Sequence, residues 1–432
     1  MNLIKGASAA TQKYMADGIR YVCENFKERS PGSHSERKAQ KYLKKELEKW
    51  ADKVEMEDFS VHPAAFMGWI PAAAVCGMLA VLFYWLTYTG VVAGSALAVL
   101  STVLVLLSLA CLVVEFLMYR EFVDFLFPRK VSRNVMARRA PRGEVKRRII
   151  FGGHTDAAKE WTYSLHGGIK SLAPVMAGSI GGLIAVTVFD VAWLIYSFTG
   201  GSYDSKFWLV CGIIQFILIP FFIAICFFIN WKVTVDGAND NLTADFIAMG
   251  VLKEMAENDV RFENTEVCAL LSGSEEAGIR GALAYAQKHK AELEEVETVF
   301  IAMDTMREIE QLQIYTQGCT GTQKNSNAVA EIIYEAGVNC GIEMKETELY
   351  PGAIDAEAFS RVGLLASGFC GVNHDPKTYY HTRLDTADNI SEECINLSLD
   401  ICLEAAKLYD EKGGIDAFRE EGRKRFKRGH NK

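Results

Sequence analysis

Residues 145–156 read VKRRIIFGGHTD, and this stretch decides the fold class of the chain. Its apolar centre, Ile149 to Phe151, lies between charged residues and a glycine pair, as is typical of a short buried strand. His154 and Asp156 follow directly. Open α/β sheets bind their ligands at the carboxyl ends of strands, so we expect these two side chains to belong to a functional site.

Alternating strand-like and helix-like segments surround this stretch. Short apolar runs bounded by polar residues predict strands at 265–273 and 298–304. Apolar residues at helical spacing predict helices at 33–51, 243–258 and 281–296. Helices that alternate with strands cover both faces of a parallel sheet. The sequence therefore predicts an α/β fold with a mixed, largely parallel central sheet flanked by helices.

Three apolar stretches interrupt this pattern. Half of the 432 residues are hydrophobic, a high share for a soluble protein. Residues 64–114 and 207–231 carry no charge, and residues 171–198 carry one, Asp190, which we expect to snorkel or to bond locally. Their length and continuity favour four membrane-spanning helices of about 20 residues over core helices of a soluble domain.

The four spans are predicted to form two hairpins, at 63–119 and 171–231. The segments 1–62, 120–170 and 232–432 then make up one further domain. Because each hairpin crosses the membrane twice, this domain and both termini are expected on the same side.

The flanking charges predict which side this is. Lys and Arg are dense in residues 119–148, after the first hairpin, whereas the far-side turns contain only Lys206. The positive-inside rule thus predicts an integral membrane protein, in the plasma membrane if the source is prokaryotic, with its polar domain in the cytoplasm. Eleven cysteines without regular spacing agree with a reducing compartment. A net charge of −8 indicates no basic surface for nucleic acid.

The polar candidates follow the predicted strands or lie in glycine-containing loops. They are His154, Asp156, Asp236, Asp240, Glu275, Glu276, Asp304 and His381. Taken singly, such residues are more often structural histidines, helix starts or N-caps. Two neighbouring divalent ions, however, need a bridging carboxylate, and each needs an imidazole and a further carboxylate. The chain contains this set together with a spare acid that can act as a base.

These segments resemble the M28 family of dizinc aminopeptidases and carboxypeptidases, from about Arg37 to Ala406. The matching steps are His154-Thr155-Asp156, Gly237-Ala238-Asn239-Asp240-Asn241, Glu275-Glu276, Asp304 and Tyr380 to Thr386, with a looser match from Asp355 to Gly363. The resemblance implies the zinc-exopeptidase fold and two divalent metal ions. Zinc is expected, and cobalt or manganese would also suit the ligands.

The resemblance also assigns the metal ligands. Asp240 is expected to bridge the two ions, His154 and Asp304 to complete the shell of one, and Glu276 and His381 that of the other. Which pair belongs to which ion stays open.

Two further roles follow from the resemblance. Glu275 is the expected general base, which takes a proton from the attacking water and delivers it to the leaving amine. Asp156 is expected to hydrogen-bond His154 and fix its tautomer, with a plain turn residue as the alternative. The inserted hairpins would hold the site close to the bilayer, so we expect peptide substrates, with a preference for hydrophobic ones.

Several residues are weighed and set aside. Asp236 is expected to brace its loop, His374 to be a surface histidine, and Tyr379 and Tyr380 to be packing residues. The cations that could hold a substrate carboxylate, and that we interpret as surface charge, are Arg307, Lys324 and Arg383.

The predicted activity is that of a metallopeptidase, and of an aminopeptidase in particular. The sequence does not decide between amino-terminal, carboxyl-terminal and dipeptide cleavage, and it does not reveal the oligomeric state. A glutaminyl-cyclase-like acyltransferase and a noncatalytic scaffold or receptor are the alternatives. A transporter is disfavoured because the spans contain few polar residues and no evident repeat.

Overall fold

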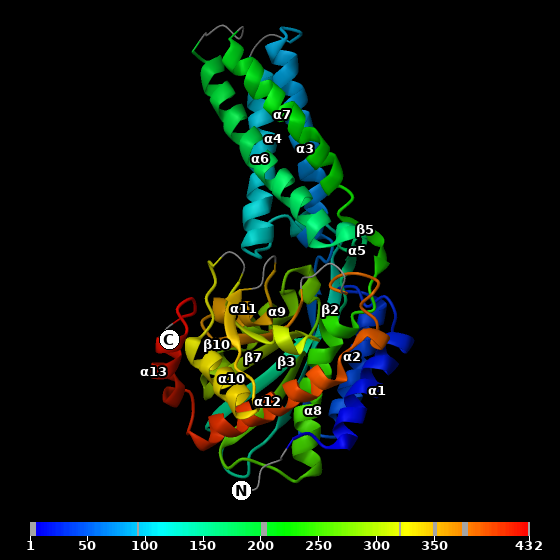
Figure 1. Ribbon diagram of the computed structural model, residues 1–432, viewed down its shortest axis with the longest axis vertical. Helices are drawn as coiled ribbons and strands as arrows, with labels where there is room; N and C mark the ends of the chain where they lie inside the picture. Colours follow the sequence, from blue (N-terminus) through cyan, green and yellow to red (C-terminus); the bar gives the residue numbers. More distant parts are fainter. Residues whose placement is uncertain are drawn as a thin grey trace.

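A computed structural model describes residues 6–92, 95–199, 205–318, 321–348, 352–373 and 379–430. An α/β domain forms one end of the molecule, and four long helices project together from it (Figure 1). Both ends of each hairpin join this domain, so the two parts meet at a single junction.

A mixed sheet of eight strands forms the centre of the domain. Its strand order is β1-β2-β6-β3-β7-β10-β8-β9. The strands span Lys53–Val61 (β1), Lys130–Arg139 (β2), Arg147–His154 (β3), Thr265–Ser272 (β6), Glu297–Met306 (β7), Gln313–Gln317 (β8), Lys345–Glu348 (β9) and Leu365–Gly371 (β10). The four central strands, β6, β3, β7 and β10, are parallel, while β1, β2 and β8 pair antiparallel with their inner neighbours. The predicted fold class is confirmed.

Helices cover both faces of the sheet because the central strands are buried on both sides. Along β3, Ile149 and Phe151 pack into one core and Ile150 into the other. The first core is closed by α1 (Ala9–Asn25), α2 (His34–Leu47), α8 (Thr243–Glu257), α10 (Asn327–Asn339) and α12 (Glu392–Glu411). The second core is closed by α9 (Arg280–Glu294) and α11 (Asp355–Arg361). Helix α13 (Asp416–Arg425) packs on α10.

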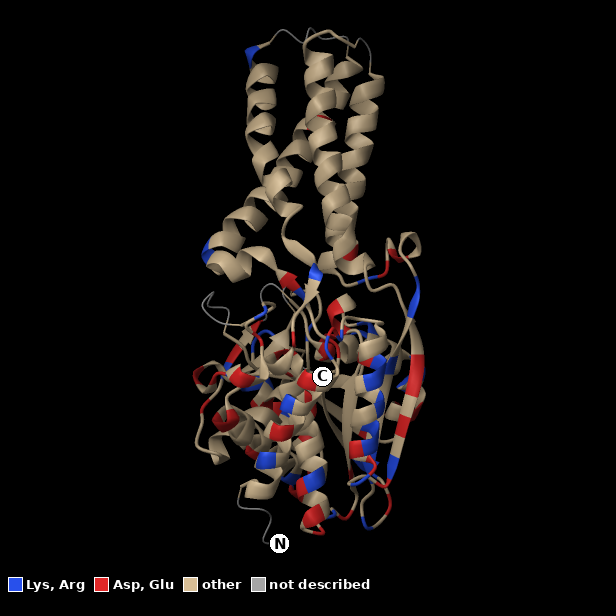
Figure 2. Ribbon diagram, turned by 90° about the vertical axis from the view of Figure 1, so that its right-hand side faces the viewer, with Lys and Arg blue, Asp and Glu red and all other residues tan. Residues whose placement is uncertain are grey.

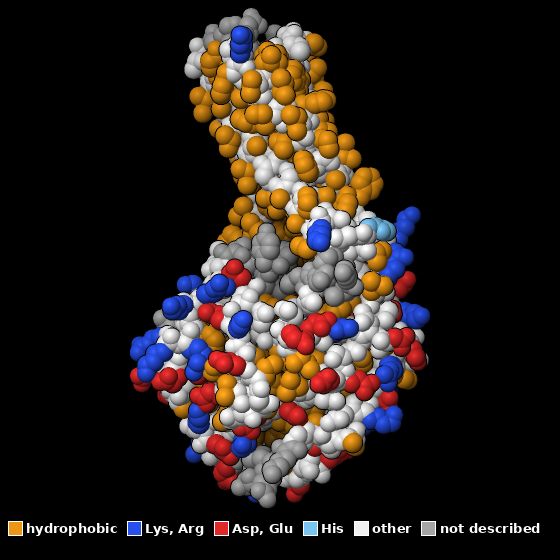
Figure 3. Space-filling view, in the orientation of Figure 1, with side chains coloured by type: hydrophobic (Ala, Val, Ile, Leu, Met, Phe, Trp, Pro, Cys, Tyr) orange, Lys and Arg blue, Asp and Glu red, His pale blue; other side chains and the backbone are white. Residues whose placement is uncertain are grey.

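The projecting helices are apolar on their outside as well as inside. They are α3 (Ala65–Tyr88), α4 (Ala96–Ala110) continued by the π-helix η1 (Cys111–Leu117), α6 (Ile169–Ser197) and α7 (Lys206–Ile225). Each is long and apolar enough to cross a membrane. Charged residues concentrate in the α/β domain (Figure 2), and hydrophobic side chains cover the visible bundle surface (Figure 3). Asp190, on α6, accepts a hydrogen bond from Ser101 of α4, so it bonds to another helix and not locally as predicted.

The second hairpin ends earlier than predicted. Helix α7 stops at Ile225, and residues 229–231, placed in the hairpin from their apolar character, begin strand β5 (Ile229–Thr234). This strand pairs with β4 (Lys159–Trp161), and Ile229 packs against Trp161 and Leu172. The apolar residues at this point thus serve the junction between the hairpin and the domain.

A buried ion pair and two hydrogen bonds to the backbone fix the first hairpin to the domain. Glu115, in η1, contacts Nη2 of Arg280 at 2.7 Å, and Arg280 begins α9 directly after the Glu275–Gly278 loop. Arg280 and Arg361 also donate to the carbonyl of Tyr119. The base of the helix bundle is therefore held close to the loop that carries Glu275 and Glu276.

Candidate metal centre

Two histidines face one aspartate from opposite sides. Nε2 of His154 lies 3.2 Å from Oδ1 of Asp240, and Nε2 of His381 lies 3.0 Å from Oδ2 of the same carboxylate. Each carboxylate oxygen of Asp240 thus faces a different imidazole. This is the arrangement required of a carboxylate that bridges two metal ions.

The remaining predicted ligands complete two groups around this carboxylate. Oε1 of Glu276 lies 3.2 Å from Nε2 of His381, and Oδ2 of Asp304 lies 3.8 Å from Nε2 of His154. His154, Asp240 and Asp304 form one group with metal-ligand spacing, and Asp240, Glu276 and His381 form the other. Oε2 of Glu275 lies 3.8 Å from Nε2 of His154, and His154, Glu275 and Glu276 form a third such group, so the predicted base adjoins the ligands.

Strand ends and tight backbone approaches bring these residues together. His154 ends β3, while Glu275 and Asp304 come from the ends of the neighbouring strands β6 and β7. Gly153 lets α8 approach the sheet, because a Cβ at this position would lie 2.6 Å from Cβ of Ala244. The loop bearing Asp240 precedes α8 and is thereby held beside His154.

Asp385 holds the Asp240 loop in place. Its carboxylate accepts hydrogen bonds from the backbone N–H groups of Asn239 and Asp240, at 2.7 and 3.1 Å. Asn241 ties the same loop to β7, donating to the carbonyl of Met303 and accepting from the N–H of Thr305. The backbones of Thr305 and His381 have positive φ, an uncommon conformation for residues with side chains.

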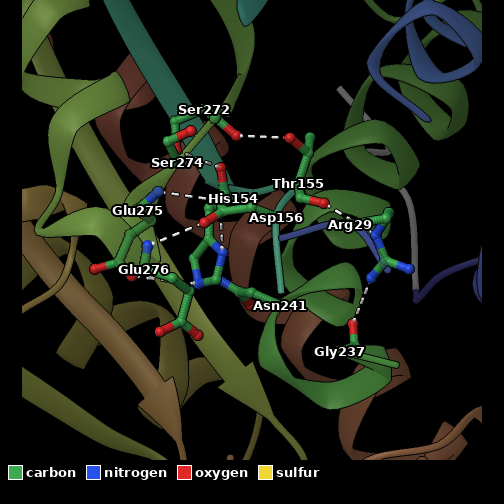
Figure 4. Close-up of polar contacts among 12 residues, drawn as sticks. Arg29, His154, Thr155, Asp156, Gly237, Asn241, Ser272, Ser274, Glu275 and Glu276 are labelled. Carbon is green, nitrogen blue, oxygen red and sulfur yellow. Dashed lines mark hydrogen bonds and ion pairs between the residues drawn. The ribbon is translucent and has the colours of Figure 1, made fainter. Parts of the chain in front are cut away.

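Asp156 connects His154 to the loop with the two glutamates. Its Oδ1 lies 3.4 Å from Nδ1 of His154, and its two oxygens accept from the backbone N–H groups of Glu275 and Glu276, each at 3.0 Å (Figure 4). The side chain therefore holds the loop with the two glutamates and lies beside an imidazole. Nδ1 of His154 has no hydrogen-bond partner among the described residues, so the predicted orienting role of Asp156 stays a prediction.

The cluster concentrates negative charge in a buried space. Burial and the neighbouring charge of Asp240 raise the pKa of Asp304 to about 8, and burial raises the pKa of Glu275 well above its usual range. Burial alone would lower the pKa of His381, but the carboxylates of Glu276 and Asp240 raise it to about 10. Divalent cations would balance this excess of carboxylate charge.

The donor atoms also suit metal ions. Nε2 of His154 and Oε1 of Glu276 are buried without a hydrogen-bond partner, although each faces other ligand-type atoms. Imidazole nitrogens and carboxylate oxygens are the ligands that zinc accepts in proteins. The described residues therefore fit a metal site.

The base of the helix bundle forms part of the wall of the site. A pocket contains Asp240, Glu275, Glu276, Asp304 and His381. Its walls also include Phe66 of α3, Phe116 of η1, Met176 of α6, and Phe228, which follows α7. The site thus lies between the α/β domain and the apolar helices.

Several residues that line or support the site were not predicted from the sequence to do so. Tyr380, interpreted as packing, lines the pocket and stacks on His381 with ring centroids 4.1 Å apart. Trp161 packs edge-on against His381 and donates its backbone N–H to the His381 carbonyl. Asp385 lies within the Tyr380 to Thr386 motif and could have been found there. Arg29, which donates to the carbonyls of Thr155 and Gly237, has no sequence signal.

Four of the residues set aside, Asp236, Arg307, Lys324 and Arg383, lie away from the described pocket wall. Asp236 contributes its backbone carbonyl to Arg29, in agreement with a bracing role. Arg307 bonds to Asn389, and Arg383 pairs with Glu160. Arg307, Arg383 and Lys324 do not line the described part of the pocket. His374 lies outside the described residues.

Solved structures share this fold. An aminopeptidase from Aneurinibacillus sp. strain AM-1 aligns with a TM-score of 0.54 and 13% identity, over 92% of this chain and 93% of that one. A glutaminyl cyclase from an Acidobacteriales bacterium aligns with a TM-score of 0.52 and 12% identity, over 96% and 99%. A Zn-dependent exopeptidase from Parabacteroides distasonis aligns with a TM-score of 0.50 and 11% identity, over 92% and 96%. At these identities the likeness concerns the fold.

The sequence itself matches a family model over part of its length. No curated protein matches the chain, but residues 219–406 match the model described as Peptidase family M28. This segment contains Asp240, Glu275, Glu276, Asp304 and His381, while His154 and Asp156 precede it. The resemblance drawn from the motifs is therefore confirmed: residues 219–406 carry the M28 peptidase pattern, on the fold of zinc exopeptidases.

Proposed function

We propose that the protein is a membrane-anchored exopeptidase, specifically an aminopeptidase, that works with two divalent ions, zinc by preference. The placement of Asp240 between His154 and His381 carries this proposal, because one carboxylate facing two imidazoles suits a pair of ions. Asp240 would bridge the ions, with Asp304 and Glu276 completing their shells.

The residues divide the chemistry between them. Two bound divalent ions supply electrophilic catalysis, since they polarise the scissile carbonyl and lower the pKa of water. Glu275 takes a proton from the attacking water and returns it to the leaving amine. Asp156 would hold the backbone of Glu275 in place beside His154 during this proton transfer.

The charge of the pocket supports cleavage from the amino end. A free α-amine is cationic and requires an acidic or carbonyl partner, whereas a terminal carboxylate requires Arg or Lys. None of the described wall residues of the pocket is Arg or Lys, so this wall offers no partner for a terminal carboxylate, and its four carboxylates are the proposed metal ligands and base. A peptide would therefore bind with its amino terminus beside the metal centre.

The experiment is cleavage mapping of a mixed peptide library by mass spectrometry, with detergent-purified, zinc-loaded protein. We expect wild type to remove single amino-terminal residues. Glu275→Gln removes the base and should reduce the rate by about 10²–10⁴-fold while metal content is unchanged. Glu294→Gln, the same change at an exposed position of α9, is the matched control and should retain the wild-type rate.

Other outcomes would redirect the proposal. Removal of carboxyl-terminal residues would overturn the aminopeptidase assignment and keep the hydrolytic one. Loss of ammonia from peptides with amino-terminal glutamine, without hydrolysis, would indicate a cyclase instead. Equal rates for wild type and Glu275→Gln would contradict the role of Glu275.

A further inference from the structure

An apolar cavity lies in the base of the helix bundle, directly beside the pocket of the metal centre. Side chains from α3, η1, α6 and α7 line it, among them Ala73 and Leu183. It shares three wall residues, Phe116, Met176 and Phe228, with the pocket that contains Glu275. The metal centre and this cavity are thus neighbouring compartments that meet at three apolar side chains.

The polar groups in the cavity wall are already bonded within the protein. The indole N–H of Trp69 donates to the carbonyl of Phe66. The hydroxyl of Ser179 donates to the carbonyls of Val175 and Phe221. Among its described wall residues the cavity offers no free side-chain partner to water or to a polar ligand, and such spaces are filled by apolar groups.

The cavity is long enough for an extended aliphatic chain. Its α6 wall runs from Met176 to Leu183, about 10 Å at the rise of an α-helix. Met176, at the boundary with the metal centre, is flexible and adapts its shape to apolar ligands. A ligand could pass this side chain without a change in the helices.

A groove on the polar side offers room for the rest of such a molecule. It is lined by Lys130 and Lys159 and meets the pocket at Met67, Trp161 and Glu276. A substrate can therefore have one apolar arm within the bundle and one polar arm toward the domain surface.

We propose that the bundle cavity is a substrate subsite, which binds an extended aliphatic arm next to the scissile bond. The substrates are accordingly amphipathic peptides or amides, with a lipid-like arm in the cavity and a polar arm in the groove. This inference rests on the proposed function, because the arm must reach the bond cleaved at the metal centre.

The test uses alkyl hydroxamates from acetyl to octanoyl, whose hydroxamate group binds zinc independently of turnover. Affinities for the zinc-loaded, detergent-purified protein are measured by titration calorimetry. We expect binding to tighten about fourfold per methylene until the cavity is filled. Ala73→Phe narrows the cavity and should abolish this gain for the longer chains, while its affinity for the acetyl compound stays at the wild-type level and shows that the site is intact.

Ala72→Phe is the matched control, because Ala72 is exposed on the neighbouring position of α3 and does not line the cavity. It should keep the wild-type dependence on chain length. Equal affinities for all chain lengths, or the same loss in both variants, would overturn the subsite even if peptides are cleaved. No binding of any hydroxamate would contradict the metal centre, and with it both proposals.

Discussion

At the residue scale, Asp156 has more contacts with the site than its place beside a ligand suggests. It lies next to His154, and it also accepts both backbone N–H groups of the glutamate pair. Its position therefore affects a metal ligand and the base together.

Asp156→Asn tests this double role. The amide retains one oxygen acceptor but turns an NH₂ group toward a backbone N–H, so one of the two loop contacts is lost. We expect zinc affinity to fall by about 10- to 100-fold, as measured by competition with a chelator, together with the hydrolysis rate. Asp236→Asn, which alters no side-chain hydrogen bond among the described residues, should leave both unchanged. If both variants bind zinc like wild type, Asp156 has no part in positioning the site.

The sequence could predict the ligands because their chemistry restricts which residue types can occupy those positions. His154, Asp240 and Glu276 sit in short motifs of fixed order. Arg29 and Trp161 could not be predicted, since they act through bonds to the backbone and through ring packing. Such contacts are set by the tertiary fold.

At the element scale, α11 carries a buried acid away from the metal ligands. The Glu357 carboxylate accepts from the N–H of Ile354 and from Asn325, at 2.7 and 2.9 Å. Burial outweighs these hydrogen bonds and raises the pKa of Glu357 from 4.5 to about 7. The folded protein therefore retains this proton at a pH where the unfolded chain has released it.

Glu357→Gln tests the resulting dependence on pH. Because the folded pKa is raised, the contribution of Glu357 to stability is fully present below pH 4.5 and is lost as pH rises through about 7. The loss amounts to ~3 kcal/mol in total. The Tm of the variant minus that of wild type, followed by thermal unfolding, should increase across this window. A difference that does not vary with pH would contradict the raised pKa.

Helices and strands could be predicted from the sequence where a single pattern of apolar residues runs through the whole segment. The buried strands β3, β6 and β7 and the long apolar helices are continuous signals of the expected length. The start of β5 could not be predicted. Ile229 and Trp231 continue the apolar run of the preceding helix, and this run looks the same whether they are helical or extended. Only pairing with β4 separates this strand from the preceding helix.

At the scale of the whole molecule, the four helices extend from the side of the domain where the metal centre lies (Figure 1). We propose that the bundle crosses the membrane and that the domain lies in the cytoplasm. The basic segment beside the junction supports this orientation. A site wall shared with membrane helices would give apolar substrates direct access from the bilayer.

Cysteine labelling tests this orientation. Thr89→Cys places a thiol at the far end of the first hairpin, and Arg419→Cys places one on α13 of the domain. On intact cells a membrane-impermeant maleimide should label the first variant, and it should label the second only after permeabilisation. Wild type supplies the background of the native cysteines. The reverse pattern would place the domain outside the cell.

The central claim is a pair of metal ions bridged by Asp240, and the metal content of the purified protein tests it most directly. After loading with zinc and removal of the excess, inductively coupled plasma mass spectrometry gives the number of ions per chain. The account predicts two, because two of the three ligand groups that the described residues form share the Asp240 carboxylate. One zinc per chain, or none, would contradict it.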